Sequence, residues 1–437
     1  MKNILVATLL SCSIAASFQA SASGPISGNG AALTTGPSSS PYSLSAAKLN
    51  PAMNSLLFSE GESMRMAYFP SFGFSLELGP VDNFADDLEE LADIIDDPSS
   101  SDDDASDILD RFNAVLESAG ENGYIKFSGQ AQAPLTPFYF YSETLDGAFG
   151  LDLSIAGIGG VSILDSELSF DNQNDSFATA TALYIKSGLE TTLALSFSRE
   201  AFKNDSGTLF AGVKAKYISI DLSKQVLPII QLAGEELGDL IKDEYDQNQN
   251  SSSDFGIDFG FVWDTETYRL GLTLEDINSP EFEYGAVGAN CNALAENTSS
   301  RSNCEAARFF SEVQGDIAQN EIHVKDPKVR IDGLISVGSG VYLSAALDLA
   351  EYNDFIGDKH QWLHGAVDYQ TDWFALSSLR AGYHKNLGGF ETSSATGGFT
   401  LFDILNVDFE YGLDSVDIDG TSAPRRVGFA LSIQEQF

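Results

Sequence analysis

Four histidines are the side chains in this sequence best suited to acid–base chemistry. His323, His360, His364 and His384 are scattered, and no G-x-S-x-G elbow, H-E-x-x-H pair or paired-cysteine metal spacing accompanies them. His364 falls on the polar face of an expected strand, where it could act as a base for a nearby serine. A single polar residue that lines water is the commoner reason for such a histidine. The sequence therefore predicts no catalytic residue, no metal site and no cofactor.

Two acidic segments have residue types that could bind a cation. Asp246-Gln-Asn248-Gln-Asn250 is similar to the start of a calcium loop, but the expected glycine and the final glutamate are missing. Asp102-Asp103-Asp104 could also hold a cation. Polar, solvated loops explain both segments better.

The N-terminus has the pattern of an export signal. Residues 1–22 begin with Lys2, continue through an apolar stretch and end in Ala20-Ser21-Ala22, the small-x-small pattern that a signal peptidase cuts. We expect the mature chain to begin near Ser23. Cys12 leaves a lipid-anchored product open, although the apolar stretch before it is short for a signal.

Two further cysteines, Cys291 and Cys304, lie in a segment that reads as a loop. Export to an oxidising compartment makes a disulfide their expected use.

The charge balance argues against nucleic acid as a partner. The chain contains 64 Asp and Glu against 23 Lys and Arg, a formal net charge of -41. Binding to phosphate backbones depends on Lys and Arg, so contact with nucleic acid is not expected. Solvated loops or adaptation to a salty medium explain the acidity better than an acidic binding surface does.

Strict alternation of apolar and polar residues is the strongest structural signal. It predicts half-buried strands through most of the second half of the chain. The clearest apolar series are Phe255, Ile257, Phe259, Phe261 and Trp263; Tyr268, Leu270, Leu272 and Leu274; Val341, Leu343, Ala345, Leu347 and Leu349; and Val407, Phe409, Tyr411 and Leu413.

Three observations favour a membrane barrel over a soluble sandwich. The second face of each strand mixes glycine, small and charged residues, which suits a wet lumen. The segments reach about ten residues, the length that a tilted strand needs to cross a bilayer, and no apolar run approaches the ~20 residues of a spanning helix. Tight connections also alternate with long ones, as periplasmic turns and external loops do in outer-membrane barrels.

The C-terminus agrees with export to the outer membrane. Val427, Phe429, Leu431 and Ile433 alternate outward, and the chain ends on Phe437. A terminal strand that ends in Phe is similar to the signal by which the barrel-insertion machinery recognises outer-membrane proteins.

These patterns divide the chain into a signal peptide (1–22), an N-terminal plug-like segment (23–61) and an all-β transmembrane antiparallel barrel (62–437). We expect about 14 strands, or 16 if Gly157, Gly159 and Gly160 form a turn rather than a kink. Helical periodicity predicts short inserts near 82–118 and 226–243 in the external loops. Expected strands lie at 62–79, 123–142, 147–157, 161–170, 176–200 and 206–221, with nine more to the end.

Several short motifs carry a family resemblance. The segment from Ser45 to Ala52, SAAKLNPA, resembles the N-terminal "NPA" segment of FadL-type transporters of hydrophobic compounds. Together with residues 69–73, 270–280 and 326–330, it makes most of the mature chain similar to the exported family labelled plasmid-transfer TraF. A thioredoxin-like transfer protein shares that label, but it would show an α/β pattern rather than period-two strands.

The resemblance implies a FadL-like barrel through which an apolar small molecule diffuses. Asn50, Pro51 and Ala52 would lie in the plug, where Asn50 and Pro51 form a turn that positions it. A turn with a purely structural role is equally compatible with Asn-Pro.

The leading functional hypothesis is passive transport of hydrophobic compounds, such as fatty acids, by a plugged barrel embedded in outer-membrane lipid. The alternative is a structural outer-membrane component of a conjugal transfer or secretion system. An outer-membrane hydrolase comes third, since no nucleophile and base can be paired. A transporter needs a continuous apolar pocket, whereas an assembly component should show a closed lumen and a large apolar or acidic external patch.

Overall fold

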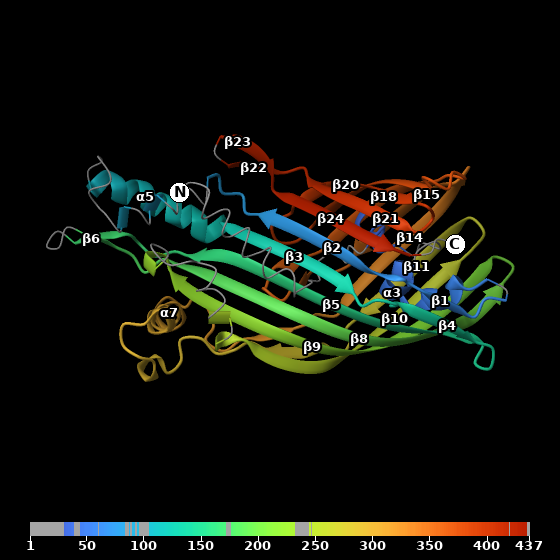
Figure 1. Cartoon of the computed structure of the whole chain (residues 1–437), viewed down its shortest axis with the longest axis horizontal. Coiled ribbons are helices and arrows are strands. Elements are labelled where there is room, and N and C mark those ends of the chain that lie inside the picture. The colour runs from blue at the N-terminus through green and yellow to red at the C-terminus, as the bar shows by residue number, and fades with distance from the viewer. Residues whose placement is uncertain are drawn as a thin grey trace.

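Long antiparallel strands dominate the computed structural model of the chain (Figure 1). The residues that it describes are 30–38, 44–59, 61–83, 87, 90, 91, 94, 95, 105–171, 176–231, 244, 245, 247–418 and 420–434. The expected signal peptide, the acidic run at 102–104, Asp246 and the terminal Phe437 lie outside these residues.

Fourteen strands form a closed ring, because the last strand of the sheet order, β8, pairs back with β5. In order around the ring they are β5 (Gly147–Leu164), β3 (Tyr124–Gln132), β2 (Phe69–Leu78), β24 (Arg426–Ile433), β21 (Leu405–Gly412), β20 (Ser393–Leu401), β19 (Ser378–Asn386), β18 (Trp362–Gln370), β15 (Val341–Asp348), β14 (Lys328–Gly338), β11 (Tyr268–Glu275), β10 (Asn250–Asp264), β9 (Gly207–Pro228) and β8 (Ala182–Asn204). Two short strands, β1 (Met64–Met66) and β4 (Phe138–Ser142), add to this ring without interrupting its closure.

The two strands expected at 147–157 and 161–170 are one strand, β5. Gly159 lies inside it, opposite Phe127 of β3. A Cβ on Gly159 would stand 2.2 Å from the Phe127 ring, so the glycine makes room for a cross-strand aromatic side chain rather than for a turn. The count of fourteen follows from this continuity.

Many large apolar residues of the barrel strands point outward and are exposed. Leu195 is 61% exposed and Phe255 is 64% exposed, although both belong to regular strands. The inward positions of the same strands are polar and buried; Thr192 and Asp258 are examples. A soluble protein would show the opposite arrangement, whereas a barrel in lipid requires this one. Other outward apolar side chains are Ile155, Leu193, Tyr217, Leu270, Ile331, Leu343, Val367, Leu379, Phe409 and Val427.

The two ends of the barrel differ in their connections. At one end, here called the turn end, short turns join β8 to β9, β10 to β11, β14 to β15 and β20 to β21. At the other, the loop end, long segments follow most strands. By the usual construction of such barrels the loop end is external.

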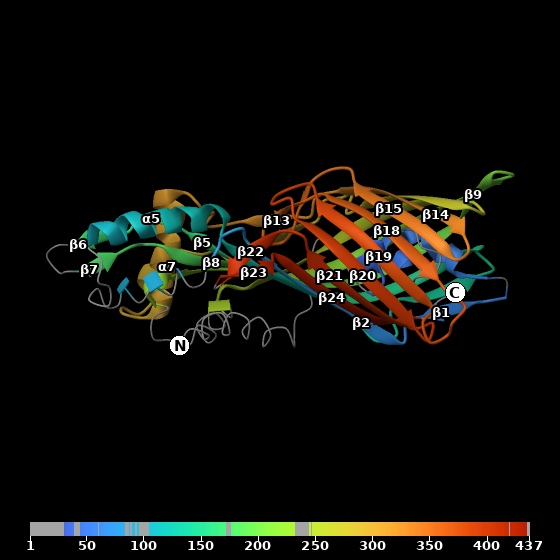
Figure 2. The same ribbon diagram turned by 90° about the horizontal axis from the view of Figure 1, so that it is seen from above.

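Three strands extend beyond the loop end and carry helices on both faces (Figures 1 and 2). Helix α5 (Ala105–Asn122) packs on one face of β5, β8 and β9, where Phe112 meets Ile163 and Ile185. Helix α7 (Ser299–Arg308) and the π-helical turn η5 (Phe309–Gln314) pack on the opposite face, around Phe310. The result is a three-layered external head.

The helical inserts differ in part from their expected bounds. Helix α5 ends at Asn122, four residues beyond the expected insert. In the second insert, Ile229–Gln231 form a 3-10 turn and residues 232–243 lie outside the described residues. Among the described residues, no helix combines the length and apolar character needed to cross a membrane.

Residues 30–38 and 44–57 of the N-terminal segment lie inside the barrel, against the inner side of its wall. Helix α2 (Ala32–Thr35) contacts β18, β19, β20 and β21, whereas the 3-10 helix η1 (Pro51–Leu57) contacts β5, β8, β9 and β10. Helix α3 (Leu44–Leu49) packs against η1. Residues 30–38 and 44–57 are called the plug below.

Candidate functional site: a charged cavity between the plug and a lid

The plug packs against the wall at a pair of glycines, Gly212 and Gly260, here called the glycine seat. Gly212 of β9 and Gly260 of β10 are register partners, so neighbouring strands both lack a side chain there. A Cβ on Gly212 would stand 2.5 Å from backbone atoms of Pro51 and Ala52, and one on Gly260 would stand 2.0 Å from Asn50 Oδ1. The backbone of Asn50-Pro51-Ala52 can approach the wall only because both positions are glycine.

Asn50 begins helix η1 by capping it. Its Oδ1 accepts a hydrogen bond of 3.0 Å from the Ala52 amide, and Pro51 occupies the first helical position, where no amide hydrogen is needed. The Nδ2 atom reaches the carbonyl oxygens of Phe261 and Leu272 at the long distances of 3.4 and 3.5 Å. The turn expected at Asn-Pro is present, and it connects the plug to β10 and β11.

Further polar contacts hold the plug against other strands. Asn54 Nδ2 donates to Ser196 Oγ at 2.8 Å, and the Ser55 amide donates to Ser198 Oγ at 2.8 Å. Tyr139 donates its hydroxyl to the Leu44 carbonyl at 3.2 Å. The plug is therefore fixed by several contacts with the wall rather than by one.

The loop end of the lumen is covered by two loops, together called the lid. The first contains β12 (Glu281–Glu283) and β13 (Ile322–Val324), and the second contains β16 (Tyr352–Asn353) and β17 (Lys359–His360). Phe282, Tyr284 and Phe355 of the lid pack on inward apolar residues of the wall, among them Ile218 and Ile220. An apolar cluster thus closes the mouth.

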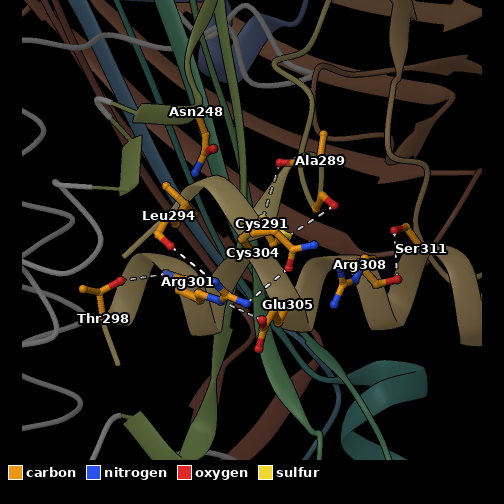
Figure 3. The surroundings of a disulfide bond; sticks show 12 residues. Asn248, Ala289, Cys291, Leu294, Thr298, Arg301, Cys304, Glu305, Arg308 and Ser311 are labelled. Atoms are coloured by element: carbon orange, nitrogen blue, oxygen red, sulfur yellow. Dashed lines mark hydrogen bonds and ion pairs between the residues drawn. A yellow bond between two sulfur atoms is a disulfide. The ribbon is translucent and has the colours of Figure 1, made fainter. Parts of the chain in front are cut away.

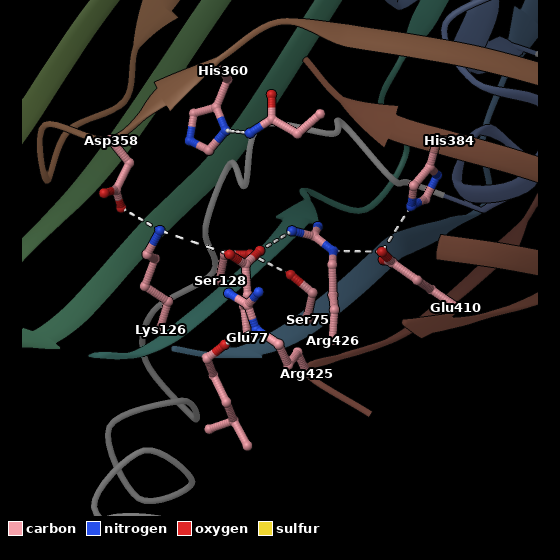
Figure 4. A network of polar contacts seen from close by, with 12 residues as sticks. Ser75, Glu77, Lys126, Ser128, Asp358, His360, His384, Glu410, Arg425 and Arg426 are labelled. Atoms are coloured by element: carbon pink, nitrogen blue, oxygen red, sulfur yellow. Dashed lines mark hydrogen bonds and ion pairs between the residues drawn. The ribbon is translucent and has the colours of Figure 1, made fainter. Parts of the chain in front are cut away.

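A polar network joins the lid to the wall (Figure 4). Lys126 Nζ lies 2.6 Å from Asp358 Oδ2 in the lid and 3.9 Å from Glu77 Oε1 in the wall. Glu77 continues the network through Arg426 Nη1 at 2.6 Å, and Arg426 also contacts Glu410. The lid is therefore held by buried ion pairs as well as by apolar packing.

Burial shifts the pKa values of two side chains of the lid, His323 and Asp358. Burial lowers the pKa of His323 to about 4, and the nearby Lys325 ammonium acts in the same direction. Burial and the neighbouring Asp354 carboxylate raise the pKa of Asp358. At neutral pH the His323 ring is therefore uncharged.

Between the plug and the lid lies a cavity of about 200 Å³. Its lining comes from three sources: the plug contributes Ala47, Lys48 and Leu49; the lid contributes His323, Lys325, Asp326, Tyr352, Asn353, Asp354 and Phe355; and the wall contributes, among others, Asp152, Glu190, Lys214, Lys216, Asp258, Glu275 and Lys328. The lining thus combines many charged side chains with apolar ones, among them Leu49, Tyr139 and Leu151.

The lysines of the wall are closely paired with acids. Lys214 Nζ lies 3.1 Å from Asp258 Oδ2, and Lys216 Nζ lies 2.7 Å from Asp258 Oδ1 and 2.7 Å from Asp276 Oδ1. Lys214 also donates a hydrogen bond of 2.7 Å to the Lys48 carbonyl of the plug. Plug and wall therefore share one lattice of ion pairs around the cavity.

The wall beside the cavity is interrupted. Strand β3 pairs with β5 as far as Gln132 and Ser154, and β4 resumes the pairing at Phe138 and Leu151. Residues 133–137 between them, called the wall break, bulge out of the regular ladder, and they stay attached to β5 through the Leu153 carbonyl, which accepts from the Ala133 amide at 2.9 Å and from Thr136 Oγ1 at 3.2 Å. Leu151 lines the cavity and is also 37% exposed on the outer surface, so the barrier between lumen and exterior is thin here.

The inner side of the wall break is sealed by polar contacts. Gln132 Nε2 donates to Asp152 Oδ1 at 2.8 Å, and Ser71 hydrogen-bonds Gln132. Lys48 Nζ of the plug lies 3.7 Å from Asp152 Oδ2. The plug therefore contributes to this seal.

The histidines do not form a catalytic arrangement in the described residues. His364 lies on the lumen side of β18, and its ring centroid is 5.4 Å from that of His384. His384, rather than His364, contacts a carboxylate, Glu410 Oε1 at 2.8 Å, and Arg426 shares that carboxylate. No described serine hydrogen-bonds either ring.

Cys291 and Cys304 form a disulfide in the external head (Figure 3). It ties the loop before α7 to the helix itself. Arg301 supports the same junction by binding the Leu294 carbonyl at 3.3 Å and Glu305 Oε1 at 2.9 Å.

The terminal strand places its apolar series as expected. Phe429, Leu431 and Ile433 share the outward face of β24, and the rings of Phe409 and Phe429 are 5.4 Å apart. Their role as an insertion signal stays a prediction.

Sequence reasoning missed the glycine seat, the lid and the ion-pair lattice. A partial signal was present, because Lys214, Lys216 and Asp258 occupy the polar positions of alternating strands, where lysine and aspartate on neighbouring strands invite pairing.

Comparison with known proteins now places the chain. Residues 47–349, more than half of its length, match the family model described as "F plasmid transfer operon, TraF, protein". The chain belongs to this TraF family. No curated protein sequence matches the TraF-family chain.

Several solved outer-membrane structures show a distant likeness to it. A TodX monoaromatic hydrocarbon channel mutant, deltaS2S3, has a TM-score of 0.48 and 11% identity, with coverage of 94% of this chain and 99% of that one. The Pseudomonas putida toluene transporter TodX has a TM-score of 0.45 and 12% identity, with coverage of 95% and 98%. Outer membrane phospholipase A from Escherichia coli has a TM-score of 0.26 and 10% identity, with coverage of 85% and 94%. The barrel fold of this TraF-family chain rests on its own strand pairing.

Proposed function

We propose that this TraF-family barrel passively transports small amphipathic molecules across the outer membrane. The observation that supports the proposal is the cavity, which is closed by the plug below and by the lid above, and which lies beside the wall break. A solute would enter when the lid opens and would leave when the plug or the wall break yields. No covalent chemistry is required.

The charged side chains of the lining favour a solute that has a polar portion as well as an apolar one. Fatty acids and hydrocarbons have long apolar parts, and the cavity offers these parts ion pairs that are costly to disturb. An apolar portion is better accommodated at the wall break, where Leu151 reaches the exterior and the rings of Phe140 and Phe149 stack 4.9 Å apart. The charged lumen would hold the polar portion.

Flux into vesicles tests the proposal. The protein is reconstituted into lipid vesicles, and the entry of a panel of neutral, anionic, cationic, zwitterionic and hydrocarbon solutes is compared with entry into protein-free vesicles. We expect at least one amphipathic solute to enter faster with protein. We also expect Gly212→Val, which unseats the plug, to increase the rate, and Gly365→Val to leave it unchanged, because a Cβ at Gly365 meets nothing within 4 Å. Equal flux with and without protein for the whole panel would reject transport.

A structural role in an outer-membrane assembly is a second candidate that one observation favours. The solvent-facing side of α5 carries Asp107, Asp110, Glu117 and Glu121 on the external head, above a lumen that the plug and lid close. Such a surface would suit a basic protein partner. Mating efficiency after deletion of the gene, compared with solute uptake by the same strain, would separate the two functions.

A further inference from the structure

The plug and the lid, which bound the cavity at its two ends, contribute different charges to its lining. The plug contributes one charged side chain, Lys48, whereas the lid contributes Lys325, Asp326, Asp354 and His323. The strength with which each of these groups is already paired decides what the cavity can offer to a solute.

At the plug end, Lys48 is the least tightly paired lysine of the lining. Its Nζ lies 3.7 Å from Asp152 Oδ2, and no side-chain hydrogen bond to it exists among the described residues. The other lining lysines hold a carboxylate oxygen within 3.1 Å, as Lys214, Lys325 and Lys328 do. Lys48 is therefore the ammonium that can accept a new anion with the smallest loss.

At the lid end, Asp326 is the carboxylate with the least compensation. Its Oδ2 accepts 3.0 Å hydrogen bonds from the Asn353 amide and from Asn353 Nδ2, and no lysine or arginine of the described chain lies within ion-pair distance. Nearby Lys325 is committed to Glu190 at 2.7 Å. His323 contributes no positive charge at neutral pH.

Asp354 adds a second carboxylate on the same side. It accepts backbone hydrogen bonds from Ile356 and Asp358 and lies 3.0 Å from His360 Nε2. Tyr352 and Phe355 also line this end, but their rings already face Lys328 Nζ at 4.6 Å and Lys325 Nζ at 5.6 Å. The attraction for a ligand's ammonium group therefore comes from the two carboxylates.

We propose that the cavity binds a small zwitterion, with its cationic group at Asp326 in the lid and its anionic group at Lys48 in the plug. This inference rests on the proposed function only in taking the cavity as the site where the transported solute pauses. A zwitterion offers a partner of opposite charge at each end and leaves the net charge of the lining unchanged.

The size of the cavity agrees with a small solute. Pockets for drug-sized ligands span roughly 300–1,000 Å³, and this cavity is about 200 Å³. A long acyl chain would not fit in full, whereas a compact amino acid would.

Matched four-carbon probes test the inference by calorimetric titration of the full chain in detergent. γ-Aminobutyrate carries both charges, butyrate carries only the anion, and butylamine carries only the cation. We expect γ-aminobutyrate to bind about tenfold or more tightly than either single-charge probe, as expected when a second charged contact is added.

Two isosteric variants assign the ends. Asp326→Asn keeps an acceptor for Asn353 but removes the charge, and should weaken γ-aminobutyrate and butylamine while leaving butyrate unchanged. Lys48→Gln keeps the carbonyl that binds Lys214, and should weaken γ-aminobutyrate and butyrate while leaving butylamine unchanged. Lys203→Gln and Glu200→Gln, at exposed positions near the turn end and outside the cavity, are the matched controls and should change nothing.

Equal affinity for the three probes, no binding of any of them, or the same loss in the variants and the controls would overturn the inference. The titration does not depend on flux. Binding that follows the charge pattern in a protein that moves no solute would reject transport and keep the site, whereas flux without this pattern would keep transport and reject the zwitterion.

Discussion

Gly212 and Gly260 face each other across β9 and β10, and the space left by their absent side chains is filled by Asn50-Pro51-Ala52 of the plug. The wall and the plug, more than 150 residues apart in sequence, are therefore shaped for each other at one point. The ion pairs around the cavity begin next to this seat, since Lys48 precedes Asn50 by two residues.

A methyl group at Gly212 should loosen the plug. The added Cβ meets backbone atoms of Pro51 and Ala52 at 2.5 Å, so either the plug or the wall has to shift. Overpacking of this kind costs about 1–3 kcal/mol. Limited proteolysis should cut the N-terminal segment faster in Gly212→Ala than in the wild type. Gly365→Ala is the control, and equal cleavage of all three proteins would contradict the role of the seat.

Removal of the disulfide should loosen α7 without affecting the barrel. A cross-link that closes a loop of about 15 residues contributes roughly 3 kcal/mol in the chain-entropy description, and Cys291 and Cys304 are 13 apart in sequence. In Cys291→Ser/Cys304→Ser, backbone amides of 299–308 should exchange hydrogen faster, and those of β18 should not. Unchanged exchange in α7 would show that packing around Phe310 holds the helix by itself.

The lid should lose stability as the pH falls. The pKa of His323 is lowered to about 4 in the folded protein, below its usual 6.5, so the open lid binds more protons than the closed lid between these values. The stabilising contribution is fully present above pH ~6.5, declines towards pH ~4 and is lost below it, by up to about 3 kcal/mol.

Hydrogen exchange of residues 281–284 and 322–324, corrected for the intrinsic rate at each pH, measures this effect. His323→Gln should remove most of the pH dependence, since it cannot gain a charge. A lid that is equally protected at pH 4 and pH 7 in the wild type would show that the ring is not shielded as described.

Loss of Lys126 should open the lid at neutral pH. Its ammonium binds Asp358 of the lid at 2.6 Å and faces Glu77 of the wall, and Lys126→Met leaves both carboxylates without this partner. A buried charged group left unpaired costs about 1–3 kcal/mol or more. Solute flux into vesicles should rise. Lys203→Met, at an exposed lysine near the turn end, is the control, and equal flux in the two variants would argue against Lys126 as a lid contact.

The sequence is sufficient to predict the strands of the barrel wall, but not the contacts inside the lumen. Outward positions such as Phe255 and Leu270 must be apolar because lipid surrounds them, so the rhythm of two appears in the chain itself. The structural role of Gly159 could not be predicted from the sequence. A glycine that makes room for Phe127 and a glycine that forms a turn can be distinguished only when the partner strand is known.

Contacts inside the barrel depend on tertiary structure rather than on a local sequence pattern. Lys216 of β9 meets Asp258 of the neighbouring strand β10 and Asp276 just after β11, residues about 40 and 60 positions away, and only the pairing and register of these strands bring them together. The lid is assembled from segments near 282 and 355 that have no shared pattern. Only Asn50-Pro51 was visible as a plug motif, and its seat on Gly212 and Gly260 was not.

Spin labelling of the protein in lipid vesicles tests most directly whether the apolar outer face of the barrel lies against lipid. Labels placed one at a time along residues 191–196 of β8 are exposed to oxygen, which partitions into lipid, and to a water-soluble nickel chelate. Leu193 and Leu195 should be reached by oxygen and protected from nickel, whereas Thr192 and Ala194, which point inward, should show little oxygen access. Equal access to nickel at Leu195 and in the surrounding water, or no alternation along the strand, would contradict a barrel whose apolar face lies against lipid.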